Sequence, residues 1–400
     1  MRKGRFFVVT LHTPHGLRRN HWHMQILIVS DSFKGSLSSL QAGQAMALGV
    51  RDAWPECHTT VRALSDGGEG MAQAFAAVTQ AQWHTATVAD PLGRPVQARY
   101  ALTHDGTAYI ETAAASGLTL LRPDERQPLL THTLGTGQLV VHALRQGARR
   151  LVVGLGGSAT NDAGMGMMQA LGVRFLDDQG RELPPCGQNL IWVQRVDDAG
   201  LMGAWREARI VAACDVRAPL YGPQGAAHVF AAQKGASPEQ TALLDKGLRH
   251  MGQLLLSQYG RDYAQQEGAG AAGGLGAALA CFGGARMASG VELLLRTPLM
   301  ERALREADLV ITGEGRWDGQ SSMGKAPWGI LQACRRFAKP CLAVFGSMGM
   351  DGIAPTRHFA AHAVATPPGQ SLAEAMMPRQ AAQNVRQATA RLLSHWGKTT

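Results

Sequence analysis

The sequence has no uninterrupted apolar run of about 18 residues, no CxxC cysteine pair and no HExxH motif. A membrane-spanning helix needs about 20 apolar residues, so the first absence argues against a membrane protein. The six cysteines lack metal-binding spacing, and we expect reduced, mostly buried thiols in a cytoplasmic protein. Ser158 stands in GGSAT rather than in G-x-S-x-G, which argues against a serine hydrolase.

Acidic residues are absent from residues 1–23, a segment that carries five Lys or Arg side chains. Removing these five from the 39 basic residues leaves 34, against 30 acidic residues, so more than half of the net charge of +9 comes from this segment. The rest of the chain is only mildly basic, which argues against nucleic-acid binding. We expect residues 1–23 to be a disordered extension or a misassigned start, with Met24 as the natural first residue.

What the chain does contain is an alternation of short apolar strands and helix-like segments. Strands are predicted at 24–30, 59–65, 307–312, 340–346 and 361–366, and helices near 38–53, 69–78, 326–337 and 371–395. The strands carry little charge, as expected where helices cover both faces of a sheet. The pattern predicts an α/β protein with a doubly wound, Rossmann- or flavodoxin-like parallel-sheet domain, formed by residues 24–80 and 285–400.

Residues 81–284 follow a different pattern. Apolar and polar residues alternate from 83 to 112 around DPLG and HDG turns, which predicts antiparallel hairpins. Two further strands and a helix near 237–258 come next, before the glycine-rich segment 268–284. We expect a second, mixed α/β domain inserted in the first. The glycine-rich segment predicts a helix start packed closely against other backbone.

The turn GLGGSA (154–159) allows three interpretations. It fits G-x-G-x-x-A after a strand, and Asp177 and Asp178 follow about 20 residues later, as in a dinucleotide fingerprint. Asp162 opposes this interpretation, because it places a negative charge on the amides that a pyrophosphate would need. A turn that merely packs tightly and a turn that binds another anion remain open.

A second glycine motif, GQSSMGK (319–325), has the G-x-x-x-x-G-K spacing of a P-loop. It is not one, because Ala326 stands where Ser or Thr would hold magnesium and the preceding strand ends too far upstream. Lys325 at a helix start nevertheless suits a cation that faces a phosphate.

Charged and polar side chains follow four predicted strands, at the edge of the sheet where open α/β proteins bind ligands. They are Asp31, Ser32 and Lys34; Asp66 and Glu69; Asp215; and Glu314, Arg316 and Asp318. A single such acid is usually a cap or turn residue. Four sets together favour a site for Mg²⁺ and phosphates, because phosphoryl transfer needs oxygen ligands, cations and a base.

Eight stretches, in order from about residue 24 to about residue 330, resemble the bacterial glycerate kinase family of the glycerate 2-kinase type. They are DSFKGSLSS, SDGGEG, AAASGL, GTGQL, GLGGSATNDAGMGMMQALG, CDVRAPLYGPQGAAHVFAAQKGA, GAGAAGGLGAAL and ADLVITGEGRWDGQSSMGK. The closing hundred residues match loosely. Trp317 and Gly319 depart from the smaller aliphatic and polar residues expected there, which we interpret as a change of loop shape.

The resemblance implies a kinase that uses ATP and Mg²⁺ to phosphorylate D-glycerate at its 2-hydroxyl, in a cleft between two domains. Catalysis would fall to Lys34, Arg316, Asp66 and Asp215, with Asp66 or Asp215 as the base, and Mg²⁺ to Glu314 and Asp318. The implied substrate and phosphate contacts are Asp31, Ser32, Gly67, Gly68, Glu69, Gly156, Gly157, Ser158, Thr160, Asn161, Lys234, Gly315, Gln320 and Lys325.

Three alternatives remain at this stage. The product could be 3-phosphoglycerate, the GLGGSA turn could serve an NAD-dependent hydroxy-acid dehydrogenase, or the chain could bind a ligand without catalysis. We expect small molecules as partners, neither nucleic acid nor membrane, and a monomer or homodimer.

Overall fold

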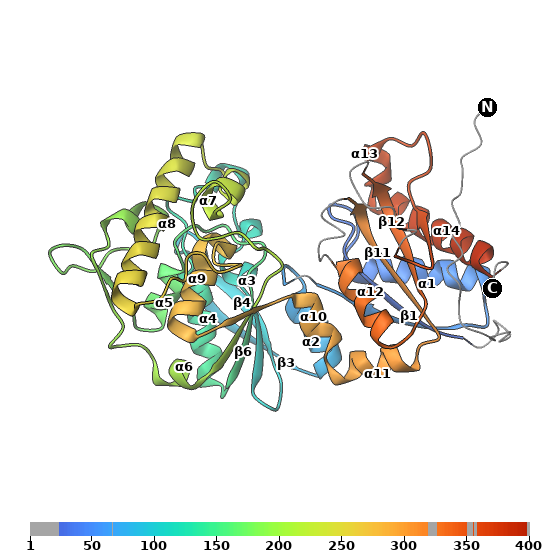
Figure 1. Cartoon of the computed structure of the whole chain (residues 1–400), viewed down its shortest axis with the longest axis horizontal. Helices are drawn as coiled ribbons and strands as arrows, with labels where there is room; N and C mark the ends of the chain where they lie inside the picture. The colour runs from blue at the N-terminus through green and yellow to red at the C-terminus, as the bar shows by residue number, and fades with distance from the viewer. Residues whose placement is uncertain (1–23, 66, 319–325, 350–354, 356–357, 398–400) are drawn as a thin grey trace. The chain divides into compact units, whose positions relative to one another are not determined.

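A computed structural model describes residues 24–65, 67–318, 326–349, 355 and 358–397 (Figure 1). Its contacts divide the chain into two units, a terminal unit (Met1–Ser65 and Val291–Thr400) and an inserted unit (Asp66–Gly290). The domain boundaries predicted from the sequence, at 80/81 and 284/285, differ from the unit boundaries at 65/66 and 290/291. The main difference is α2 (Met71–Thr79), which packs against strands of the inserted unit.

The terminal unit contains a five-stranded sheet in which every neighbouring pair is parallel. Its strands are β1 (Gln25–Ser30), β2 (His58–Ala63), β11 (Leu309–Trp317), β12 (Cys341–Met348) and β13 (Ala361–Val364). Their spatial order is β2-β1-β11-β12-β13, which is the flavodoxin order 2-1-3-4-5. The predicted doubly wound sheet is confirmed, and its strand order reverses between β1 and β11.

Helices cover both faces of this sheet (Figure 1). α1 (Ser39–Ala53) and α14 (Pro378–Trp396) pack against each other on one face, while α11 (Pro298–Glu306) and α12 (Ala326–Arg336) contact the strands from the other. The short α10 (Gly290–Leu295) begins at the boundary between the units. The buried apolar residues of β1, β11, β12, α1 and α14 form one core.

The helix predicted over 371–395 is in fact two helices. α13 covers Leu372–Ala375, and α14 begins at Pro378. Met377, the residue before the proline, is extended (φ −61°, ψ 127°). The ring of Pro378 would clash with a preceding helical turn, so the proline starts a new helix at its first position.

The inserted unit contains a six-stranded mixed sheet in the order β10-β9-β6-β5-β4-β3. Its strands are β3 (Gln82–Ala89), β4 (Pro95–Leu102), β5 (Thr107–Glu111), β6 (Arg150–Gly154), β9 (Arg209–Ala213) and β10 (Arg286–Ala288). β3, β4 and β5 pair antiparallel, which confirms the predicted hairpins, and the remaining pairs are parallel. β7 (Arg174–Leu176) and β8 (Arg195–Asp197) form a separate antiparallel ribbon.

The helices of the inserted unit surround this sheet. Besides α2 they are α3 (Ala113–Ser116), α4 (Leu134–Arg145), α5 (Met165–Ala170), α6 (Gly203–Glu207), α7 (Ala226–Phe230), α8 (Pro238–Tyr259), α9 (Ala271–Gly283) and the 3₁₀ turns η2 (Leu118–Leu120), η3 (Pro123–Glu125), η4 (Gly187–Trp192) and η5 (Ala232–Lys234). The close packing predicted for the glycine-rich segment is confirmed. A Cβ on Gly273 would lie 2.1 Å from the carbonyl oxygen of Thr160.

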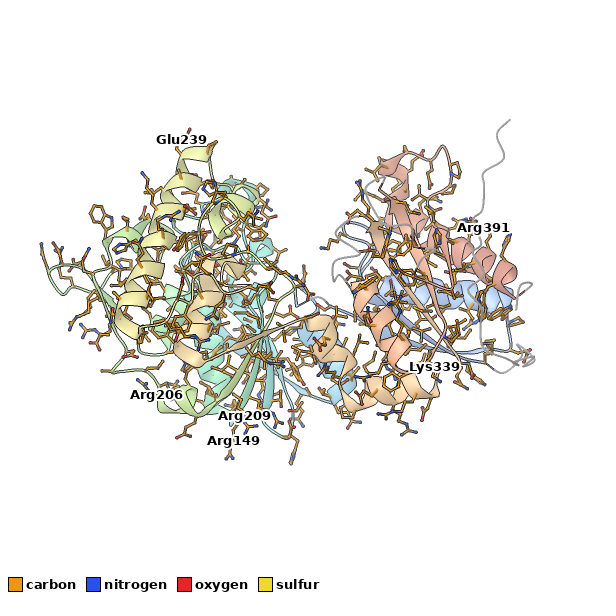
Figure 2. The ribbon with its side chains drawn as sticks, in the orientation of Figure 1. Arg149, Arg206, Arg209, Glu239, Lys339 and Arg391 are labelled. Atoms are coloured by element: carbon orange, nitrogen blue, oxygen red, sulfur yellow. The ribbon has the colours of Figure 1, made fainter. Side chains whose placement is uncertain are left out.

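Three arginines lie near the amino-terminal ends of the parallel strands β6 and β9 in the mixed sheet. Arg149, just before β6, and Arg209, the first residue of β9, are exposed and lie side by side, with Arg206 nearby (Figure 2). This edge of the sheet is opposite to the one where parallel strands deliver ligand-binding groups. Within the described residues no helix is long and apolar enough to cross a membrane, and the six cysteines are free.

Candidate active site

The switch point of the terminal sheet is the place between β1 and β11 where the strand order reverses. Here two of the segments predicted to carry site residues are hydrogen-bonded to each other. The amide of Asp31, just after β1, donates a 2.9 Å hydrogen bond to the carbonyl of Gly313 in β11. The Ser30 hydroxyl donates to the same carbonyl at 3.1 Å. In open α/β sheets the crevice beside such a strand reversal is where ligands bind.

The residues after β1 form a tight, anchored turn. Phe33 and Leu37 exchange backbone hydrogen bonds of 2.9 and 3.0 Å, and both side chains are buried. Gly35 occupies the turn with φ +80°, a conformation that favours glycine. Lys34 is exposed on this turn, while Asp31 and Ser32 are half-buried. The turn therefore presents a cation from a fixed backbone.

The strand predicted over 307–312, with residues 313–318 in a loop after it, is wrong in its end point. β11 continues to Trp317, and Glu314 and Arg316 pair with residues of β12. The Glu314 residue is 5% exposed, Arg316 is exposed, and Asp318 follows the strand half-buried. The strand can extend past the end of β1 because β12 supplies its hydrogen bonds there.

A glycine brings this extension close to the Lys34 turn. A Cβ on Gly315 would lie 3.2 Å from Phe33 Cα and 3.4 Å from Lys34 N, tighter than most Cβ contacts. The backbone segment of Asp31, Ser32 and Lys34 therefore lies against the segment of Glu314, Gly315 and Arg316.

Trp317 has a different role from the one expected. Its ring centroid lies 4.9 Å from that of Phe345 and 5.6 Å from that of Phe359, and its side chain is fully buried. The residue belongs to an aromatic cluster of the core rather than to a loop. Its contribution is to fix the end of β11.

In the inserted unit a pair of glycines, Gly67 and Gly68, packs against the predicted anion-binding turn. The carbonyl of Gly67 accepts a hydrogen bond of 3.2 Å from the Gly156 amide. A Cβ on Gly67 would lie 2.6 Å from Ala213 O, and one on Gly156 would lie 2.4 Å from Gly68 Cα. The carboxyl ends of β6 and β9 thus meet this segment backbone to backbone, which requires glycine. Glu69 follows it, exposed.

Glu111, at the end of β5, is a site-proximal acid that the sequence analysis missed. Its Oε1 accepts a 2.7 Å hydrogen bond from the Ala72 amide in the first turn of α2. Burial raises the pKa of this carboxyl, while the amides of Ala72 and Gly70 lower it. The residue holds the start of α2 and so the Gly67–Gly70 segment. An acid closing a strand was the available signal.

Lys234 and Ser158, both predicted contacts, lie together although 76 residues separate them. The Lys234 ammonium donates 3.0 Å to Ser158 Oγ and 2.6 Å to Thr160 O. The Lys234 residue is 3% exposed. Burial lowers the pKa of its ammonium to about 8, partly opposed by the Asp162 carboxylate. The lysine therefore binds the protein's own turn.

Several buried polar atoms just after β5 and in the turn after β6 have no partner among the described residues. They are Thr160 Oγ1, Asn161 Oδ1, Asn161 Nδ2 and Thr112 Oγ1. All three residues are fully buried. Buried polar atoms are nearly always hydrogen-bonded, so these atoms are suited to a ligand or an ordered water.

Asp162 is engaged in the fold. Its Oδ2 accepts from the Thr133 amide at 2.8 Å and from the Gly166 amide at 3.1 Å. Asp177, the acid of the dinucleotide pattern, accepts from the amides of Gln179 and Arg181 in the turn after β7. β7 is not a neighbour of β6. Neither acid therefore supports a dinucleotide fingerprint.

The remaining predicted residues are less informative. Asp215 follows β9 and is exposed, and Gly157 adopts φ +73°. Asp66, Gln320 and Lys325 lie outside the described residues. Within the described part of the chain no group of three His, Cys, Asp or Glu side chains could hold a metal on its own.

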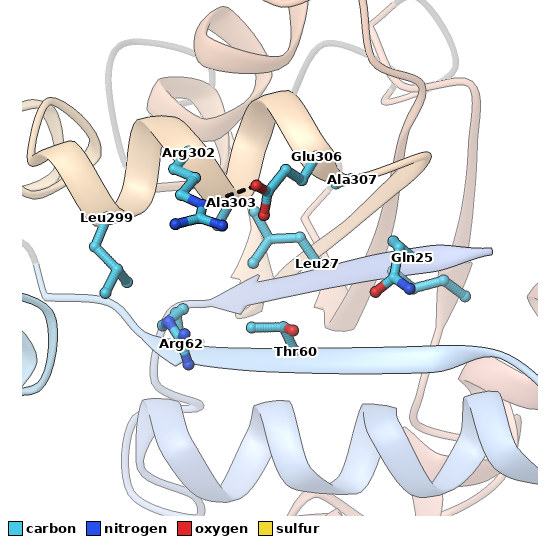
Figure 3. A pocket seen from close by; sticks show the side chains of 10 residues that line it. Gln25, Leu27, Thr60, Arg62, Leu299, Arg302, Ala303, Glu306 and Ala307 are labelled. Carbon is cyan, nitrogen blue, oxygen red and sulfur yellow. Dashed lines mark hydrogen bonds and ion pairs between the residues drawn. The ribbon is translucent and has the colours of Figure 1, made fainter. Parts of the chain in front are cut away.

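A cavity of about 270 Å³ lies elsewhere in the terminal unit, between α11 and the strands β1 and β2 (Figure 3). Gln25, Leu27, Thr60 and Arg62 line it from the sheet. It opens beside the amino-terminal half of β1, away from Asp31. At its rim Arg302 donates 2.8 Å to Glu306, as Figure 3 shows. We therefore do not assign it to the candidate site.

Comparison with known proteins identifies the family. A model described as "Glycerate kinase family" matches residues 26–397. The chain belongs to the glycerate kinase family. The match includes the closing hundred residues, whose motifs alone matched loosely.

Individual relatives agree with this membership of the glycerate kinase family. The chain is 43% identical to a glycerate kinase of Bacillus subtilis over 84% of its length and 88% of the relative's. It is 42% identical to a glycerate 2-kinase of Escherichia coli, over 82% and 86% respectively. A crystal structure described as a glycerate kinase 2 from Salmonella typhimurium LT2 aligns with TM-score 0.78 and 39% identity, covering 94% of this chain and 99% of that one. The chain is accordingly an enzyme of the phosphotransferase class.

Proposed function

We propose that the chain transfers the γ-phosphoryl group of ATP to the 2-hydroxyl of D-glycerate, giving 2-phosphoglycerate. Membership of the glycerate kinase family supports the reaction, and the 42% identity to a relative named glycerate 2-kinase supports position 2. The observation that carries the proposal is the switch point, where the 2.9 Å hydrogen bond from Asp31 to Gly313 holds the Lys34 turn against β11. This contact holds the backbone that carries Lys34 against the strand that carries Glu314 and Arg316.

The proposed roles follow from charge and exposure. Lys34 and Arg316 are exposed cations that hold the substrate carboxylate or the transferred phosphoryl group. Asp66 or Asp215 accepts the proton of the hydroxyl. The turn 156–162 donates amides to ATP phosphates or to the glycerate carboxylate. In this proposal residues of both units act on the same pair of substrates.

The carboxylates of Glu314 and Asp318 have the oxygen chemistry that Mg²⁺ prefers. Glu314 carries a buried carboxylate, and Asp318 follows two positions after Arg316. Mg²⁺ is usually held by one or two carboxylates together with waters and substrate phosphates, so a cage of three protein ligands is not required. When bound, it would neutralise charge on the phosphates of ATP. The chain's own part is to hold the two carboxylates in place.

A coupled ADP-release assay tests the proposal. D-Glycerate is compared with other small hydroxy acids at equal concentration, with ATP and Mg²⁺ present, and NMR of the product assigns the phosphate to carbon 2 or carbon 3. ADP release selective for D-glycerate supports the kinase. A 3-phospho product corrects the position, and the absence of ADP release with D-glycerate overturns the proposal.

A further inference from the structure

The contact between Lys234 and Ser158 determines which way the hydroxyl proton of Ser158 can point. A lysine ammonium has donor protons and no acceptor. In the 3.0 Å contact Ser158 Oγ must therefore accept, and its own O–H proton has to point to another group. The pKa of about 8 keeps Lys234 protonated at pH 7.

The surroundings of Ser158 suit an anionic acceptor for that proton. Ser158 lies on the turn after β6, at the carboxyl edge of the parallel strands. The neighbouring Thr160 Oγ1 and the Asn161 amide group are buried without partners among the described residues. Leaving such groups unpaired destabilises a fold, so a partner that completes them stabilises the complex.

We propose that Lys234 is a positioning residue that makes Ser158 an obligate hydrogen-bond donor to an anionic oxygen of a bound substrate, beside Thr160 and Asn161. This deepens, and rests on, the proposed glycerate kinase function. The anionic oxygen belongs either to the carboxylate of the hydroxy acid or to a phosphate of the nucleotide. A hydrogen bond to a charged oxygen is stronger than a neutral one, so its loss should be measurable as a change in one KM.

The test compares Ser158→Ala, Lys234→Met and their double variant. We expect each single variant to raise the KM for one substrate, D-glycerate or ATP, by about 10- to 100-fold, and we expect the double variant to be no worse than the singles. The substrate affected identifies which oxyanion Ser158 contacts. Unchanged KM values for both substrates, or effects that multiply independently in the double variant, overturn the proposal.

Thr131→Val is the matched control. The Thr131 hydroxyl donates 2.8 Å to Ala159 O, so this variant removes a buried hydrogen bond from the same turn without altering the Ser158 proton. We expect it to lower Tm and to leave both KM values within twofold of wild type. A KM rise in Thr131→Val as large as that in Ser158→Ala would mean that general loosening of the turn explains the effect, and the proposal would fail.

Two further measurements keep the test decisive. Should Lys234→Met not fold, Ser158→Thr replaces it, because a threonine retains the hydroxyl and should restore KM to near the wild-type value. Calorimetric titration with inorganic phosphate needs no turnover. Phosphate binding by wild type that weakens in Ser158→Ala supports the proposal even if D-glycerate proves not to be the substrate. The same titration with D-glycerate tests the carboxylate, and equal affinity of both proteins for both ligands overturns the proposal.

Discussion

Gly315 and Phe33 approach so closely that a Cβ on the glycine would lie 3.2 Å from Phe33 Cα. The contact connects the end of β11 to the turn that carries Lys34. Two segments from opposite ends of the chain therefore share one rigid geometry, and changes in either one should be measurable in catalysis.

The Lys34 ammonium is the first group to test. Lys34→Ala should lower kcat by at least ~100-fold, as the loss of a phosphate-holding cation usually does. Because the side chain is exposed, Tm should change little. The coupled ADP-release assay and a thermal melt measure the two quantities.

Lys246→Ala is the matched control, since Lys246 is an exposed lysine on α8 of the inserted unit. Near-normal kcat in Lys34→Ala, or an equal loss in Lys246→Ala, would contradict the assigned role.

Gly156 tests the backbone contact with Gly68. Gly156→Ala would place a Cβ 2.4 Å from Gly68 Cα, so backbone must move. We expect a loss of about 1–3 kcal/mol in the free energy of unfolding, as for overpacked sites, together with reduced kcat. Urea unfolding and steady-state kinetics check this. Gly203→Ala, with nothing within 4 Å of the new Cβ, should leave both unchanged.

Trp317 tests whether the aromatic cluster fixes the end of β11. Trp317→Ala should destabilise the protein by about 3–5 kcal/mol, because a large, fully buried side chain is removed. Trp192→Ala, at a residue that is 63% exposed, should change stability by less than about 0.5 kcal/mol. Chemical denaturation measures both. Similar values for the two variants would refute the buried role.

The buried Lys234 predicts a pH dependence of stability. Its pKa is 10.5 when unperturbed and about 8 when folded, so between these values the unfolded state binds more protons. Stability should therefore rise with pH across this window, by up to roughly 1 kcal/mol per pH unit. The quantity to measure is the difference in unfolding free energy between wild type and Lys234→Met. The titration of the other groups contributes equally to both proteins and cancels in this difference. A difference that stays flat from pH 8 to 10.5 would contradict a depressed pKa.

Local patterns in the sequence were sufficient for much of the fold. Apolar runs predicted the parallel strands, and alternation with DPLG and HDG turns predicted the hairpins, because both depend on neighbouring residues. The length of β11 was not predictable in this way. Its second half, GEGRW, has glycines and charges, and it is a strand because β12 pairs with it.

The same distinction between local signals and long-range packing applies to the residues of the candidate site. Acids and lysines after strands could be read from the sequence, since their position depends on the strand before them. The pairing of Lys234 with Ser158 could not, because it depends on how η5 packs against the turn after β6. Pro378, by contrast, was a readable local signal for the break between α13 and α14.

The place of β1 between β2 and β11 has a consequence for biosynthesis. The Ser30 to Gly313 hydrogen bond spans 283 positions, so a ribosome must make about three quarters of the chain before β1 gains its second neighbour. The Asp66–Gly290 unit is complete much earlier and is able to fold first. Until the last three strands emerge, β1 exposes an unpaired apolar edge, and nascent chains stalled before residue 309 should depend on chaperones.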